Sequence, residues 1–89
     1  MEKRIGAAII LVNNTESVPP LNHILSKHSD IIRGRQGIPI KDREVNIITI
    51  VLEGTTDQIS SLTGQIGRLS GVEVKSALVK NSLNKTKES

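Results

Sequence analysis

The stretch from Ile31 to Val79 constrains the fold most, because signals for strand, turn, strand, helix and strand follow one another with short connections. The first predicted strand of this stretch is IIRGRQGIPI, which has a proline next to its end, and the predicted turn after it is the polar segment KDRE. The next predicted strand is VNIITIVLEG, a β-branched run that stops at a glycine. A helix is predicted for TTDQISSLTGQIGRLS, whose apolar residues recur at helical spacing. The last predicted strand is GVEVKSALV, a further β-branched run. Few residues remain for loops, so the order of the elements is tightly constrained.

The first thirty residues predict the missing half of the same pattern. RIGAAIILVN, residues 4–13, is expected as a strand, and PLNHILSKH as a helix whose first residue is Pro20. Strands joined by two helical crossovers and one hairpin form a four-stranded antiparallel sheet with both helices on one face. We therefore predict a single α+β, ferredoxin-like β-α-β-β-α-β domain over residues 1–80. Residues 81–89 have no apolar pattern and are expected to be a mobile, basic C-terminal tail.

The second predicted helix has clear boundary signals. Thr55 and Gln58 have the spacing of a capping box, and Gly71 is expected to end the helix in a left-handed conformation. Gly64 and Gly67 lie inside it, where each costs about 1 kcal/mol relative to alanine. Two explanations stay open: a close approach of the helix to a neighbouring backbone, or simple tolerance of the two glycines.

The composition excludes several classes of function. The 89 residues contain no Cys, Phe, Tyr or Trp, which excludes disulfides, thiolate chemistry and the aromatic platforms on which single-stranded nucleic acids stack. The net charge is +3, but residues 80–89 carry +2 of it and residues 1–79 are almost neutral. No run reaches the ~18 apolar residues of a membrane span, and no signal-peptide cleavage pattern is present. We expect a cytoplasmic protein that neither enters membranes nor binds DNA directly.

Two of the predicted strands are apolar on both faces. A sheet with one face in water normally alternates apolar and polar residues. Here the residues of both parities are apolar in the first strand (Ile5, Ala7, Ile9 and Leu11; Gly6, Ala8, Ile10 and Val12) and nearly so in residues 45–52. The two helices can cover only one face, so we predict a homo-oligomer, a dimer or a tetramer, with the second face or an edge in its interface.

Three segments carry a family resemblance: Ile32-x-Gly34-Arg35-x-Gly37-Ile38-Pro39, Gly54-Thr55-Thr56-Asp57 and Leu62-Thr63-Gly64-x-x-Gly67-Arg68-Leu69-x-Gly71-Val72. Over about residues 3–80 the sequence resembles the small ACT-like proteins of the iron-only hydrogenase system regulator family. That resemblance implies a fold similar to ACT domains and to the ligand-sensing C-terminal domain of the nickel-responsive repressor. It also implies a regulatory, oligomeric module that binds a small molecule.

The chain departs from those relatives at two points. The loop after the first strand reads Asn14-Thr15-Glu16-Ser17 and lacks the Pro-Gly with which many ACT domains meet an amino acid. The predicted strands hold neither His nor Cys, the ligand types of the nickel repressor. Amino-acid binding in the usual mode and nickel sensing are therefore not expected, and we predict no cofactor and no metal.

Two groups of residues are candidates for ligand binding. Asn13, Asn14 and Ser17 lie in the loop after the first strand and could donate hydrogen bonds to a ligand. Arg33 and Arg35 are two apart in the second strand, so they are expected to share a face and to hold a carboxylate or phosphate. The alternative for the arginines is an edge strand protected by charge against aggregation.

Other sites are less consistent with the sequence. His23 and His28 are five apart on one predicted helix and point in different directions, and the adjacent residues His28-Ser29-Asp30 cannot converge as a triad. Gly34-Arg35-Gln36-Gly37 matches the loop of RNA-binding KH domains, but a strand rather than a helix is predicted after it. We therefore predict a non-enzymatic oligomeric regulatory module that binds a small ligand or a partner protein between subunits. The alternatives are a structural or adaptor oligomer without a ligand and, less favoured, a nucleic-acid-binding protein.

Overall fold

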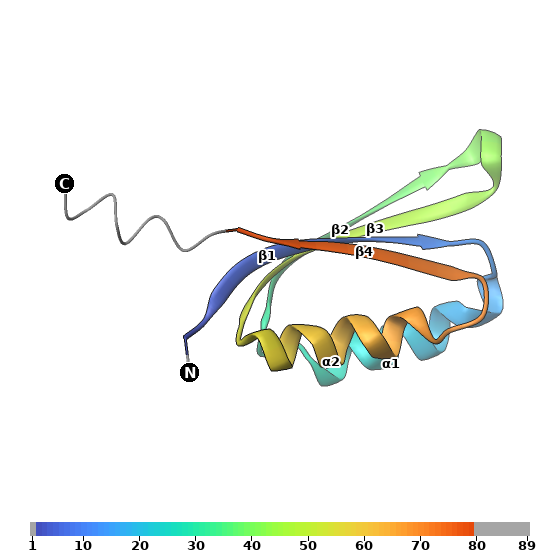
Figure 1. The fold of residues 1–89 in the computed structure, drawn as a ribbon. Helices are drawn as coiled ribbons and strands as arrows, with labels where there is room; N and C mark the ends of the chain where they lie inside the picture. Colours follow the sequence, from blue (N-terminus) through green and yellow to red (C-terminus); the bar gives the residue numbers. More distant parts are fainter. Residues whose placement is uncertain (1, 80–89) are drawn as a thin grey trace.

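The computed structural model describes residues 2–79, and these form one two-layer domain. The elements are β1 (Arg4–Val12), α1 (Val18–Lys27), β2 (Ile32–Ile40), β3 (Val45–Gly54), α2 (Thr56–Gly67) and β4 (Val72–Leu78). The strands form one antiparallel sheet in the order β2-β3-β1-β4, and both helices cover the same face (Figure 1). The predicted ferredoxin-like α+β fold is confirmed. The predicted basic tail, residues 81–89, lies outside the described residues.

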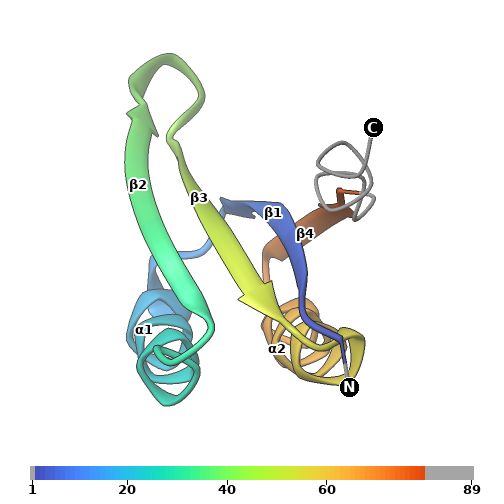
Figure 2. The same cartoon turned by 90° about the vertical axis from the view of Figure 1, so that its left-hand side faces the viewer.

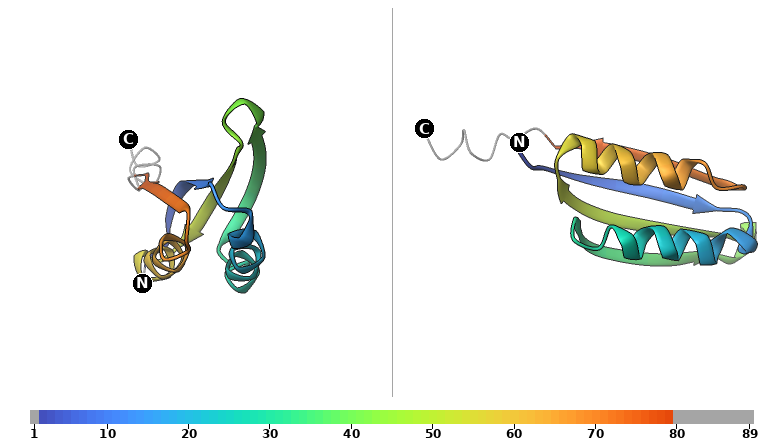
Figure 3. Two further views of the ribbon diagram at one scale, coloured as in Figure 1. Left: turned by 90° about the vertical axis from the view of Figure 1, so that its right-hand side faces the viewer. Right: turned by 90° about the horizontal axis from the view of Figure 1, so that it is seen from below.

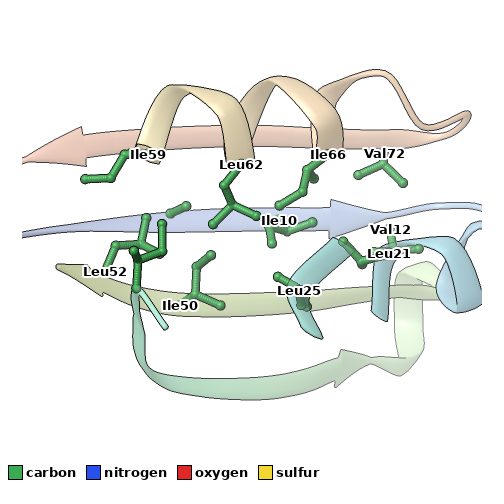
Figure 4. Packing of buried hydrophobic residues seen from close by; sticks show 12 residues of the cluster. Ile10, Val12, Leu21, Leu25, Ile50, Leu52, Ile59, Leu62, Ile66 and Val72 are labelled. Atoms are coloured by element: carbon green, nitrogen blue, oxygen red, sulfur yellow. The ribbon is translucent and has the colours of Figure 1, made fainter. Parts of the chain in front are cut away.

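The core lies between the helices and the inner face of the sheet. β1 is central, pairing with β3 from Arg4↔Gly54 to Val12↔Asn46 and with β4 on its other side. The two helices run along the sheet, and Figure 3 shows them side by side. Figure 4 shows their apolar side chains meeting those of the strands in one layer. The buried hydrophobic residues are Ala8, Ile10, Val12, Leu21, Leu25, Ile31, Ile50, Leu52, Ile59, Leu62, Ile66 and Val72.

The start of α1 differs from its prediction. The helix begins at Val18, two residues before Pro20, and is preceded by a short 3₁₀ turn at Thr15–Ser17. Pro19 and Pro20 fit in the first turn because N–H groups there have no acceptor within the helix, so a missing N–H costs nothing.

The boundaries of α2 are partly as predicted. The capping box is present: the Gln58 N–H donates to Thr55 Oγ1 over 3.1 Å, and the Thr55 N–H donates to Gln58 Oε1 over 2.8 Å. The helix ends at Gly67, however, and Gly71 takes its positive φ of 68° in the turn into β4. A Cβ at Gly64 would meet nothing within 4 Å, and one at Gly67 only Val74 Cγ1 at 3.5 Å. Of the two explanations, the helix therefore simply tolerates Gly64 and Gly67, and neither glycine allows a close approach to a neighbouring backbone.

The hairpin of β2 and β3 projects past the rest of the domain. β1 ends at Val12, which is opposite Asn46, so Val45 and the turn over residues 41–44 lie beyond the end of the central strand. Figure 2 shows this hairpin extending away from both helices. Within residues 2–79 no helix has the length and apolar character needed to cross a membrane.

Candidate functional site

The outer face of the sheet, which we call the open face, has an apolar centre that no described element covers. Figure 1 shows both helices on the opposite side. The register places Ala7 beside Val51, Ile9 beside Thr49 and Leu11 beside Ile47 on this face. Ile9 is 55% exposed and Val51 47% exposed, whereas Ile10 and Ile50, on the inner face, are fully buried. The predicted second apolar face therefore exists, and this chain's own helices leave it in contact with solvent.

The loop between β1 and α1, which holds three predicted ligand residues, is tied to the loop between α2 and β4. The backbone N–H of Asn13 donates to the Gly71 carbonyl over 2.7 Å. Ser17 is only 5% exposed, and its Oγ donates to the Ser70 carbonyl over 2.6 Å. Asn14 Oδ1 accepts the N–H of Glu16 over 3.0 Å and caps the 3₁₀ turn. Ser17 and Asn14 thus have structural partners, while the side chain of Asn13 is exposed.

The proline pair explains why the Ser17 hydroxyl points across to the other loop. Ser17 is the N-cap residue of α1, and an N-cap side chain normally accepts the N–H of the second or third helical residue. Those residues are Pro19 and Pro20, which have no N–H. The hydroxyl makes no capping bond and donates to Ser70 instead.

The two predicted arginines have different side-chain partners. A β-bulge between Ile32 and Gly34 interrupts the regular alternation that would place them on one face. Arg33 Nε donates to Glu53 Oε1 over 3.0 Å in an exposed ion pair. Arg35 Nη2 instead donates to Asn22 Oδ1 of α1 over 3.2 Å. Both border a shallow pocket of about 290 Å³ between α1 and β2, but each guanidinium is held by a different partner.

A second hollow, which we call the hairpin groove, was not predicted. It has a volume of about 260 Å³ and lies between the first turns of α1 and the helix-facing side of the β2–β3 hairpin. Asn22, Arg35 and Asn46 are among its polar lining residues. The sequence contains part of the information needed to predict this groove. Gly37 and Pro39 are two apart in the strand, so they lie on the same face and leave space there. Which helix residues face them depends on the packing of α1.

The two histidines of α1 do not form part of a metal cluster. His28 Nδ1 lies 2.8 Å from the Ile24 carbonyl at the end of the helix, and His23 is exposed. Among residues 2–79 no three His, Cys, Asp or Glu side chains come together in a way that could hold a metal ion.

Comparisons with known proteins identify the family. The family described as "TM1266-like: Iron-only hydrogenase system regulator, putative" matches residues 4–76. The protein TM1266 from Thermotoga maritima has a solved structure that is 34% identical, with a TM-score of 0.85 over 89% of this chain and all of that one. The C-terminal domain of MgtC from Mycobacterium tuberculosis is 13% identical with a TM-score of 0.68, covering 88% of this chain and 89% of that one, and this likeness concerns the fold alone. No curated protein matches the sequence. The chain belongs to the TM1266-like family.

Proposed function

We propose that the protein is a non-enzymatic regulatory module that assembles from identical subunits through the open face of its sheet. In this proposal the assembly, a dimer or a tetramer, responds to a small ligand or to a partner protein. The observation that carries the proposal is the exposed apolar centre of the open face around Ile9 and Val51. The family's regulatory description agrees with it.

The energetics favour covering this face. Full burial of an aliphatic side chain is worth about 1.5–3 kcal/mol. Ile5, Ile9 and Val51 are each 44–55% exposed, so completing their burial contributes about 1 kcal/mol apiece from each subunit. Contiguous apolar surface of this kind is typical of protein–protein interfaces. Lys75 and Glu73 of β4 flank the centre beside Ile9 and Leu11 and provide a polar rim.

The predicted ligand residues differ in whether their side chains are free to contact a ligand. Asn13 and Arg35 are exposed and have side-chain donors available to a ligand. Asn14 and Ser17 would have to give up the bonds to Glu16 and Ser70, so in our proposal they shape the loop. Arg33 would have to break its ion pair with Glu53 before it could bind a ligand.

Sedimentation equilibrium of the wild type and of Ile9→Glu tests the assembly. We expect the wild type to have the mass of an oligomer, and Ile9→Glu to have the mass of one chain because a charge on this face cannot be desolvated cheaply. Ser60→Glu on the exposed side of α2 adds the same charge elsewhere and should keep the wild-type mass. A monomeric wild type at micromolar concentration would refute the proposed assembly.

Thermal unfolding followed by circular dichroism tests the ligand. Amino acids, nucleotides, organic anions and divalent metals are added separately, with the oligomer mass recorded beside each. A dose-dependent rise in melting temperature with one class supports a ligand-responsive module, because a ligand that binds only the folded state stabilises it. If no compound changes the melting temperature of a stable oligomer, the alternative of an adaptor without a ligand is favoured.

A further inference from the structure

The hairpin groove has an apolar floor that remains accessible to solvent. Val18 of α1 and Ile48 of β3 line it; both pack against the core and are only partly buried. Val12 closes its inner end, where β1 stops. The hairpin projects past this end of the central strand (Figure 2). Apolar surface of this shape can enclose a small apolar group.

Two residues of β2 beyond Arg35 add little bulk to the wall of the groove. Gly37 is opposite Ile48, and Pro39 is opposite Asn46. A Cβ at Gly37 would meet nothing within 4 Å, and the glycine has no positive φ that would require it. The backbone conformation therefore does not require a glycine here, and a side chain at this position would enter open space.

The polar end of the groove is rich in hydrogen-bond donors and carries positive charge. Arg35 is oriented by Asn22 Oδ1 at 3.2 Å, which leaves further guanidinium N–H groups and the Asn22 amide N–H groups as donors. The Asn46 side-chain amide lies on the opposite wall, on β3. Among residues 2–79 no Asp or Glu lines the groove, so no carboxylate of the described chain neutralises Arg35 there. Charge and donors at one end and an apolar floor together fit a carboxylate with an apolar body.

We propose that the hairpin groove binds a small monocarboxylate, with its carboxylate on Arg35 and its hydrocarbon part over Val18 and Ile48. The volume of about 260 Å³ is slightly below the usual range of ligand pockets and limits the ligand to a body of a few carbons. A phosphorylated ligand fits less well, because the groove offers one guanidinium and a mostly apolar lining.

The groove and the open face share one wall. Ile38 and Ile47 pair on the open side of the hairpin, and Gly37 and Ile48 pair on the groove side. Ile38 is 44% exposed and continues the apolar surface of the open face. A bound carboxylate holds the hairpin against α1 and so changes how Ile38 meets a second subunit. This coupling step rests on the assembly proposed above, whereas binding in the groove does not.

Titration of ¹⁵N-labelled protein with sodium hexanoate, followed by NMR, tests the site. We expect saturable shifts of the side-chain amides of Asn22 and Asn46 and of the backbone amide of Gly37. Hexanamide, which has no charge, and inorganic phosphate, which has no apolar body, should each bind at least about tenfold more weakly. Shifts spread over Ala7, Ile9 and Val51 without saturation, or equal binding of phosphate, would overturn the proposal.

Paired glycine variants separate the groove from the open face. Gly37→Trp fills the groove and should abolish the hexanoate shifts. Gly34→Trp is the matched control, because Gly34 is opposite Val51, on the open face, and a Cβ there also meets nothing within 4 Å. Each variant adds the single Trp to a chain that has none, so its fluorescence reports whether the variant folds. Retained hexanoate binding in folded Gly37→Trp would overturn the proposal.

Arginine variants provide the second control. Arg35→Gln should weaken hexanoate binding by about tenfold or more, because a charged hydrogen bond is lost. Arg33→Gln should leave it within roughly twofold, because Arg33 pairs with Glu53 outside the groove. Equal effects of the two would refute the assignment to Arg35. If hexanoate does not bind while Ile9→Glu still dissociates the oligomer, the groove proposal fails and the proposed assembly stands.

Discussion

The hydrogen bond between Ser17 and Ser70 offers a sharp test of how the two loops at this end of the domain are held. Ser17→Ala removes a hydroxyl that is 5% exposed and donates over 2.6 Å. A hydrogen bond of this kind contributes about 0.5–1.5 kcal/mol net. The bond is only part-buried, so water can replace it in part and some of the loss is recovered. No helix cap is lost, because Pro19 and Pro20 offer no N–H to the hydroxyl.

We therefore expect Ser17→Ala to lower the free energy of unfolding by about 1 kcal/mol, which is a fall of roughly 4–8 °C in melting temperature for a domain of this size. Urea unfolding followed by circular dichroism measures it, since the chain has no Trp or Tyr. The urea midpoint should fall with an unchanged slope. Ser29→Ala makes the same chemical change at an exposed position and should stay within about 0.5 kcal/mol of the wild type.

The same variant decides between a structural and a ligand-binding Ser17. A change in unfolding free energy within about 0.5 kcal/mol, the range of ordinary surface substitutions, would refute the structural role. Unchanged stability together with loss of a ligand-induced rise in melting temperature would identify Ser17 as a ligand contact.

Three further substitutions test the local structure of α2 and the turn that follows, each by urea unfolding. Thr55→Ala should cost about 1 kcal/mol, because the Oγ1 that accepts the Gln58 N–H is lost; an unchanged midpoint would contradict the cap. Gly64→Ala should stabilise by about 0.5–1 kcal/mol, since the site is exposed and a Cβ meets nothing; a loss of stability would indicate an unseen contact. Gly71→Ala should cost about 1–3 kcal/mol, because φ is 68° and the new Cβ would lie 2.7 Å from Asn14 Cβ; a neutral result would refute this close approach.

The candidate sites could be predicted only where one element supplied the whole argument. A second apolar face was predictable, because residues 4–13 are apolar at both strand parities. That Ile9 and Val51 share this face follows from the register of β1 and β3. A common face for Arg33 and Arg35 was expected from the same parity, but the β-bulge between Ile32 and Gly34 interrupts the alternation. Local patterns do not specify such an extra residue.

The hairpin groove could not be predicted, because residues of four elements, β1, α1, β2 and β3, line it. Its lining requires α1 to begin at Val18 and the hairpin to extend past Val12, the end of β1. The partner of Arg35 is Asn22, thirteen residues earlier and on another element, so no short sequence pattern relates the two. Their proximity results from the packing of α1 beneath β2 and β3.

The sequence by itself determined the order of the elements, the antiparallel sheet with two helices on one face, and the capping box of α2. These follow from the periodicity of apolar residues and from short-range hydrogen bonds, which act between residues close in the chain. Tertiary structure alone decided that the Ser17 hydroxyl binds Ser70, that Gly71 must clear Asn14, and that the two arginines have different partners. These contacts join segments far apart in the chain, and only the packed core brings such segments within hydrogen-bond or van der Waals distance.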